Sequence, residues 1–180
     1  MRQLLVERLA QRAEETAALG ESLAKALMAM RAQSAAQGAA QPQQGRGPAP
    51  PASPLVIYLS GDLGAGKTTF VQGFVRGCGI TDAVRSPTYA LLEPYESNGL
   101  ALLHLDLYRL RDPTELETLG LRDWAASSTV WLIEWPEKGE GHLPPADVRA
   151  EFSVPHSGHL VRLFGASPPG SRWLEMMKSA

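Results

Sequence analysis

The chain has 180 residues, a formal net charge of −2 and an apolar content of 44%, which suffices for a sizeable core. This length predicts one domain with room for an appendage, and the charge excludes a strongly basic nucleic-acid binder. No apolar run approaches the roughly 20 residues that span a bilayer, and the N-terminus lacks the apolar stretch of a signal peptide. The single cysteine, Cys78, excludes an internal disulfide and is expected to be a buried thiol. We therefore expect a soluble, cytoplasmic protein that does not enter a membrane.

Two segments of different composition precede the predicted core. Residues 1–32 carry leucines at three- and four-residue spacings between charged residues, which predicts a helical segment that packs on the core. Gly20 is a candidate break between two helices, and a partner-binding helix is the alternative interpretation. Residues 33–54 are rich in Gln, Pro, Ala and Gly without periodicity, so a flexible linker or insert is expected there.

The pattern from residue 55 to residue 166 is that of a globular core. An apolar, β-branched run at 55–59 predicts a buried strand, and a helix should follow at 67–76. Alternating strands and helices predict an α/β fold with a mostly parallel sheet, to which a closing hairpin adds antiparallel edge strands. Residues 167–180 are expected to form a C-terminal tail. Further strands are predicted at 89–95, 100–107, 130–133, 151–154 and 160–164, with a short helix at 113–119.

The strongest motif is Gly-Asp-Leu-Gly-Ala-Gly-Lys-Thr at 61–68, which matches the phosphate-binding loop G-x-x-x-x-G-K-[ST] between a predicted strand and a predicted helix. With it, the α/β pattern predicts a P-loop NTPase-like three-layer α/β/α sandwich. Its glycines allow backbone N–H groups to face phosphate oxygens. Lys67 should reach the β- and γ-phosphates of ATP, and the Thr68 hydroxyl should bind Mg²⁺. The other loop residues expected at the nucleotide are Asp62, Leu63, Gly64, Ala65 and Gly66.

Two acidic residues follow predicted strands. Glu134 ends the apolar run at 130–133, which is the usual position for the acid that holds Mg²⁺ beside a phosphate loop. Earlier in the chain, alternation along residues 104–109 places His104, Asp106 and Tyr108 on one face of a strand. Asp106 is therefore a candidate for metal binding or for orienting the attacking water, with a surface or capping acid as the alternative.

Several residues near these motifs keep more than one interpretation. Trp135 is expected to pack rather than to stack on a nucleotide. His104 is expected to be packed or hydrogen-bonded, because no second ligand at zinc spacing accompanies it. Arg109 could contact phosphate or form a structural ion pair. Thr88, in Ser-Pro-Thr-Tyr at 86–89, could sense the γ-phosphate or belong to a plain turn.

Taken together, the motifs resemble the bacterial TsaE (YjeE) family. The resemblance covers about residues 12–165. It implies a Mg²⁺-dependent ATPase subunit required for threonylcarbamoyladenosine (t6A) modification of tRNAs that read codons beginning with adenine. It also implies partnership with the TsaB and TsaD subunits, with tRNA contacted only through that complex. The motifs that carry it are the loop at 61–69, Ser-Pro-Thr-Tyr at 86–89, His-Leu-Asp-Leu-Tyr-Arg at 104–109 and Ile-Glu-Trp-Pro-Glu-Lys at 133–138.

The resemblance further implies roles for individual residues. Lys67 and Thr68 would bind phosphate and Mg²⁺, Glu134 would be the acid of the metal site, and Asp106 would be needed for hydrolysis. The implied catalytic residues are thus Lys67, Asp106 and Glu134, and the implied metal ligands are Thr68 and Glu134.

The resemblance also implies that two loops lie near the nucleotide. Thr88 would lie in a switch-like loop. Gly158 would lie against the nucleotide, in a turn where His159 stands in the place of an arginine frequent in the family.

A small-molecule kinase and a nucleotide-gated adaptor are the alternative functions.

Overall fold

The computed structural model describes most of the chain. Thr88 and the rest of the Ser-Pro-Thr-Tyr segment lie outside the described residues. Within the described residues, no helix is long and apolar enough to cross a membrane. The described ranges are 3–39, 54–81, 84, 91–97, 99–125 and 129–179.

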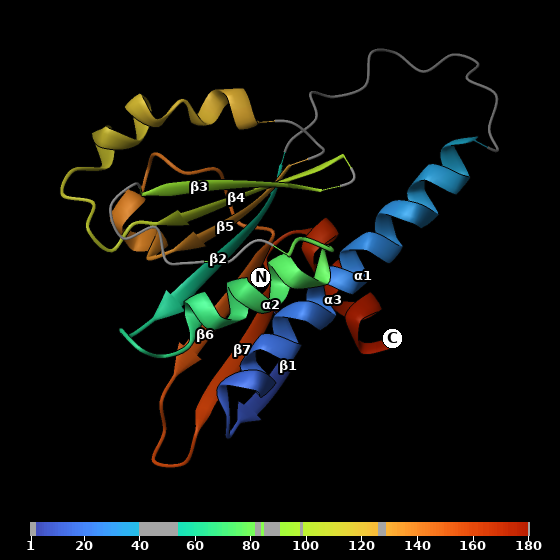
Figure 1. Cartoon of the computed structure of the whole chain (residues 1–180), viewed down its shortest axis with the longest axis horizontal. Helices are drawn as coiled ribbons and strands as arrows, with labels where there is room; N and C mark the ends of the chain where they lie inside the picture. Colours follow the sequence, from blue (N-terminus) through green and yellow to red (C-terminus); the bar gives the residue numbers. More distant parts are fainter. Residues whose placement is uncertain are drawn as a thin grey trace.

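The described residues form a seven-stranded mixed sheet (Figure 1). Its strands are β1 (Gln3–Ala10), β2 (Leu55–Gly61), β3 (Leu92–Ser97), β4 (Leu100–Asp106), β5 (Thr129–Glu134), β6 (Val148–Ser153) and β7 (His159–Gly165). Their order across the sheet is β1-β7-β6-β2-β5-β4-β3. The four central strands run parallel, whereas β3 at one edge and β7 and β1 at the other pair antiparallel. The predicted α/β fold with antiparallel edge strands is confirmed.

Helices cover both faces of this sheet, which gives three layers. They are α1 (Ala13–Ala39), α2 (Lys67–Gly77) and α3 (Pro168–Ser179), with the short 3₁₀ helices η1 (Pro113–Leu119), η2 (Leu121–Trp124) and η3 (Pro136–Gly139). Strand alternation sends Ile57 and Leu59 of β2 into the core shared with α1, α2 and α3. Val56 joins the opposite core, which contains Leu116 of η1 and Leu121 of η2. One layer is therefore α-helical and the other is built from 3₁₀ turns.

The N-terminal segment differs from the predicted helix over residues 1–32. Residues Gln3–Ala10 form the edge strand β1, which pairs antiparallel with β7. Gly20 does not divide the following helix, because it lies inside α1, where a Cβ atom would collide with the carbonyl oxygen of Phe70 on α2. The glycine thus permits a close helix contact instead of ending a helix.

Two further boundaries differ from the sequence prediction. Helix α1 continues to Ala39, so the first part of the predicted linker at 33–54 is helical, and residues 40–53 lie outside the described residues. The expected tail at 167–180 contains α3, whose Trp173 is fully buried and donates its indole hydrogen to the carbonyl oxygen of Leu23 at 2.8 Å. Burial of this large aromatic side chain stabilises the C-terminal helix against the core, which the sequence pattern of the segment did not predict.

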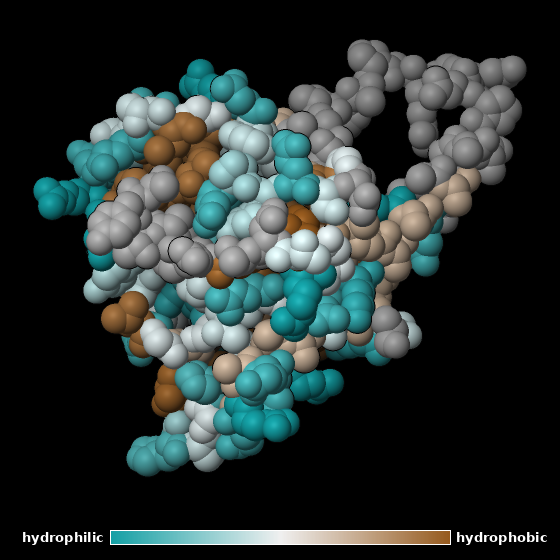
Figure 2. Space-filling model, in the orientation of Figure 1, coloured by the Kyte–Doolittle hydropathy of each residue, from teal (hydrophilic) through white to brown (hydrophobic). Residues whose placement is uncertain are grey.

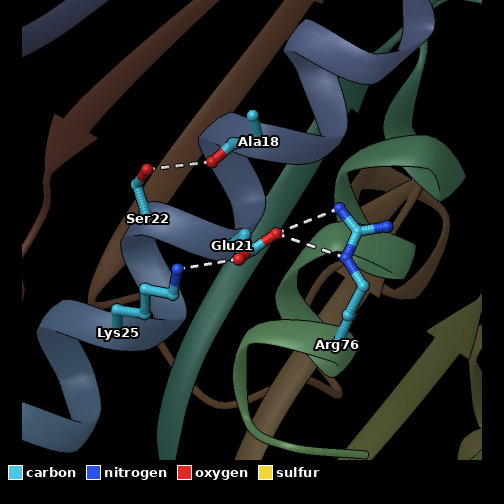
Figure 3. A network of polar contacts seen from close by, with 5 residues as sticks. All are labelled: Ala18, Glu21, Ser22, Lys25 and Arg76. Atoms are coloured by element: carbon cyan, nitrogen blue, oxygen red, sulfur yellow. Dashed lines mark hydrogen bonds and ion pairs between the residues drawn. The ribbon is translucent and has the colours of Figure 1, made fainter. Parts of the chain in front are cut away.

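Helix α2 is held tightly against α1. A Cβ atom at Gly73 would collide with the carbonyl oxygen of Ala17, so the two backbones approach closely. At the margin of this contact, Glu21 of α1 accepts from Arg76 of α2 at 3.1 Å and pairs with Lys25 at 2.8 Å (Figure 3). The helix that follows the phosphate-loop motif is therefore fixed by backbone contact at its centre and by ion pairs outside it.

The apolar residues on one face and the single cysteine can be described briefly. Figure 2 shows that apolar colour on the coloured part of this face is divided into small patches among hydrophilic residues. Cys78 is buried, as expected, and burial raises the pKa of its thiol to about 12. Because the thiolate is the reactive form of cysteine, this thiol is inert near neutral pH.

Candidate functional site

The loop at 61–68 connects β2 to α2, so the motif has the strand and the helix that a phosphate-binding loop requires. Gly61 has a φ of 144°, and a Cβ atom there would collide with the carbonyl oxygen of Phe152. Gly66, the residue before α2, has a φ of 103°, which side-chain-bearing residues rarely adopt. The loop conformation therefore depends on glycine at both ends. The backbone N–H groups of the first turn of α2 point toward the loop, as at any helix N-terminus.

Lys67 is folded over this loop. Its ammonium group donates to the carbonyl oxygens of Gly61 at 2.6 Å and Asp62 at 2.9 Å, and it lies 4.0 Å from the centre of the Trp135 ring. Burial lowers the pKa of Lys67, and the charge of Glu134 is the largest influence in the opposite direction. The cation is thus held at the loop by two uncharged carbonyl oxygens and an aromatic ring, partners that the negatively charged oxygens of a bound phosphate could replace.

The two acidic residues emerge beside the loop. Asp106 at the end of β4 is the Cα partner of Glu134 at the end of β5, and Glu134 is in turn the partner of Leu59 on β2. The carboxyl ends of parallel strands meet at one edge of a sheet, which is where ligands bind in open α/β folds. The structure therefore brings together Lys67, Thr68, Asp106 and Glu134, as the sequence predicted.

Glu134 has two hydrogen-bond donors on one oxygen. The residue is 2% exposed, and its Oε1 accepts from the Thr68 hydroxyl at 2.9 Å. The same oxygen lies 3.0 Å from Nε2 of His104, which is fully buried. Oxygen ligands are those that Mg²⁺ prefers, and a hydroxyl with one carboxylate is a common protein share of a magnesium site beside phosphates. Thr68 and Glu134 therefore fit a magnesium ion.

These residues border a cavity of about 440 Å³. Trp135 and Leu91 line it and have positive φ angles of 58° and 55°, the two such non-glycine residues in the described part of the chain. Strained backbone of this kind clusters at functional sites. Trp135 packs on Tyr108, as expected, with ring centres 5.1 Å apart, but its contact with Lys67 was not predicted. The cavity is lined by Leu63, Gly64, Gly66, Lys67, Thr68, Thr69, Leu91, Asp106, Tyr108, Arg109, Glu134 and Trp135.

The predicted residue Gly158 lies outside the lining of this cavity. A Cβ atom there would collide with the carbonyl oxygen of Ala10, so its close packing on the end of β1 explains the glycine. The next residue, His159, reaches the loop, because its Nδ1 lies 3.2 Å from the carbonyl oxygen of Ala65. A nucleotide contact by Gly158 stays a prediction, as does one by Thr88, which lies outside the described residues.

Besides the contact of Trp135 with Lys67, two features of the site were not predicted from the sequence. Leu91 lies in no motif, and nothing in its sequence context indicated that it lines the cavity. The contact of His104 with Glu134 joins two strands, and only the predicted alternation along residues 104–109 pointed toward it.

Strand β2, the glycine loop, α2 and the acid at the end of β5 define an α/β protein with a phosphate-binding-loop motif. A family model described as threonylcarbamoyl adenosine biosynthesis protein TsaE matches residues 10–160. The match covers most of the chain, which therefore belongs to the TsaE family. This family is named for its part in the biosynthesis of threonylcarbamoyladenosine in tRNA.

Individual relatives agree with this assignment. The chain is 52% identical over 94 residues to tRNA threonylcarbamoyladenosine biosynthesis protein TsaE of Haemophilus influenzae, covering 52% of this chain and 60% of the relative. It is 40% identical over 118 residues to the protein of the same name from Bacillus subtilis, covering 66% of this chain and 72% of that one. The crystal structure of YdiB from Bacillus subtilis has the same fold, with a TM-score of 0.71 at 24% identity, over 99% of this chain and 97% of that one.

Proposed function

We propose that this chain is a Mg²⁺-dependent ATPase subunit required for t6A modification of tRNAs that read codons beginning with adenine, and that it acts with the TsaB and TsaD subunits. The observation that carries the proposal is the placement of the hydroxyl of Thr68, the last residue of the loop motif and part of the first turn of α2, at 2.9 Å from the buried carboxylate of Glu134. A phosphate-binding loop and an acid in hydrogen-bond contact are the parts from which P-loop proteins build a magnesium–triphosphate site.

The residues take separate parts in this proposal. Lys67 exchanges the carbonyl oxygens of Gly61 and Asp62 for the β- and γ-phosphate oxygens of ATP. The oxygens of Thr68 and Glu134 would hold Mg²⁺, which when bound would offset the negative charge on the phosphates. Asp106 accepts a hydrogen bond from the attacking water and so orients it toward the γ-phosphorus atom.

The charge of the chain supports indirect contact with tRNA. Neutralising a phosphate backbone requires clustered Lys and Arg, whereas this chain carries 17 Lys and Arg against 19 Asp and Glu. We therefore assign tRNA binding to the partner subunits and expect weak tRNA affinity for the isolated chain. A tight, salt-sensitive complex between tRNA and this chain alone would contradict that assignment.

The test is a reconstitution with purified TsaB and TsaD. ATP hydrolysis is measured for this chain alone and with both partners, and t6A formation is followed over several turnovers. We expect hydrolysis that the partners stimulate, and repeated modification that requires this chain and fails with Lys67→Met. Phosphate transferred to a metabolite would contradict the proposal in favour of a kinase. A Glu134→Ala variant that binds ATP without hydrolysing it, yet sustains repeated modification, would show a nucleotide-gated adaptor instead.

A further inference from the structure

His104 is a polar side chain buried in the middle of the sheet. It lies on β4, where its Cα partners are Leu132 on β5 and Glu93 on β3, and it has no solvent exposure. A buried polar group is costly unless it is hydrogen-bonded. The ring uses Nε2 for its contact with Glu134 at 3.0 Å, and Nδ1 has no hydrogen-bond partner among the described residues. The imidazole is thus committed to Glu134 through one nitrogen.

The contact has a defined direction. A carboxylate oxygen can only accept a hydrogen bond, so Nε2 of His104 carries the hydrogen that it donates to Oε1 of Glu134. The Thr68 hydroxyl donates to the same oxygen, and neither donor uses Oε2. Two donors from different elements, β4 and α2, therefore set the direction of one carboxylate.

The two donors differ in whether they have to change hydrogen-bond partner when the nucleotide and metal ion bind. Thr68 is a proposed metal ligand, so its hydroxyl has to reorient around an incoming ion. His104 is enclosed in the sheet and lies beyond the lining of the cavity, so its hydrogen bond can persist throughout. It is the donor able to hold Glu134 in place while Thr68 changes partner.

We propose that His104 is a positioning residue that fixes the carboxylate of Glu134 for the magnesium ion by donating from Nε2. The inference rests on the proposed function, because it concerns the same magnesium–ATP site. Partners that orient a metal ligand in this way contribute about 10- to 100-fold to metal affinity or activity.

Two matched variants separate this role from a purely structural one. In His104→Gln, the amide nitrogen can take the place of Nε2 and still donate to Glu134. In His104→Asn, the shorter side chain places its amide near the position of Nδ1, out of reach of Glu134. Both replacements are polar and uncharged, so the cost of burying them is similar.

The measurement is ATP affinity in EDTA and in Mg²⁺, by equilibrium binding. We expect all three proteins to bind ATP equally in EDTA. Mg²⁺ should tighten binding in the wild type and in His104→Gln, whereas this tightening should fall about tenfold or more in His104→Asn. Loss in the asparagine variant with rescue by glutamine is a pattern that general destabilisation does not produce.

The outcomes distinguish the two proposals. A wild-type protein that binds no ATP with Mg²⁺ contradicts the proposed function. A wild type that shows the Mg²⁺ effect, with His104→Asn equal to it, overturns the positioning role alone. Equal loss in both variants also overturns it, because the Nε2 hydrogen would then not be the feature that matters.

A second measurement covers an asparagine variant that fails to fold. Wild-type protein labelled with ¹⁵N-histidine is followed by NMR, with the ring signals of His104 assigned as those absent from the spectrum of His104→Gln. Adding Mg²⁺ to the ATP-bound protein should shift the Nε2 signal, because the acceptor Glu134 gains a cation. An unchanged signal, under conditions where Mg²⁺ tightens ATP binding, would overturn the inference.

Discussion

The ends of β4 and β5 carry acidic residues that are direct partners across the sheet but have different surroundings. Glu134 on β5 is buried and accepts hydrogen bonds from two other elements. Asp106 on β4 is half-buried and accepts the backbone N–H of Tyr108, two residues further along its own chain, at 3.1 Å. The two acidic residues occupy equivalent strand positions, so they differ in their neighbours. The buried, doubly hydrogen-bonded Glu134 suits a fixed metal ligand, and the more exposed Asp106 suits a contact with water.

The largest expected effect comes from Glu134→Gln. The amide keeps the shape of the side chain but removes the charge that the proposed magnesium site needs. Since a bound metal contributes several kcal/mol to a phosphoryl-transfer transition state, we expect ATP hydrolysis to fall about a thousandfold. Single-turnover hydrolysis in the presence of TsaB and TsaD is the assay, and ATP binding in EDTA serves as the folding control. Hydrolysis within a few-fold of the wild type would remove Glu134 from the metal site.

A smaller effect is expected for Asp106→Asn. If Asp106 orients water, the variant should lose about a hundredfold in hydrolysis, which is typical of a positioned acid–base group. It should retain the Mg²⁺-dependent gain in ATP affinity that Glu134→Gln loses. Loss of that gain in both variants would mean that the two acids share the metal, and the contrast between β4 and β5 would then fail.

Gly73→Ala tests the packing that holds α2 in position. This position matters for the difference between Glu134 and Asp106, because α2 carries Thr68, which contacts Glu134. Helix propensity alone would make alanine more stable than glycine by up to about 1 kcal/mol. The close contact with Ala17 predicts the opposite, a loss of about 1–3 kcal/mol in the free energy of unfolding. Urea denaturation measures the difference, with the exposed Ser22→Ala on α1 as the control. A stabilised Gly73→Ala would show that α1 and α2 do not pack as described.

The smallest effect is expected for Arg76→Gln, which removes an exposed partner of Glu21 at the margin of the same helix contact. Lys25 and then Arg76 lower the pKa of Glu21, so their contribution is present above the ordinary glutamate pKa of 4.5 and disappears as the pH falls. Thermal unfolding should show a slight loss at neutral pH that vanishes in acid and in high salt. A difference that persists in acid would indicate that Arg76 acts through packing.

The parts of the fold that rest on local pattern were predictable. The buried run at 55–59 and the glycine spacing of the loop specify β2, the loop and the start of α2 without distant information. The edge strand β1 was not predictable in this way. Its leucines fit a helical spacing, and its strand conformation comes from pairing with β7 at the far end of the chain.

The candidate site divides along the same line. The sequence supplied Lys67, Thr68, Asp106 and Glu134, because each stands at the end of a recognisable strand or loop. The sequence did not predict that Thr68 and His104 both contact the same oxygen of Glu134. These three residues come from three elements, and only the folded sheet fixes their relative positions.

The most direct test of the account is the binding of ATP to the isolated chain with and without Mg²⁺, compared between the wild type and Lys67→Met by calorimetry. We predict one saturable site in the wild type, with tighter binding in Mg²⁺ than in EDTA, and loss of most of that affinity in the variant. No saturable binding by the wild type, or equal binding by Lys67→Met, would contradict the claim that the loop at 61–68 is a magnesium–ATP site.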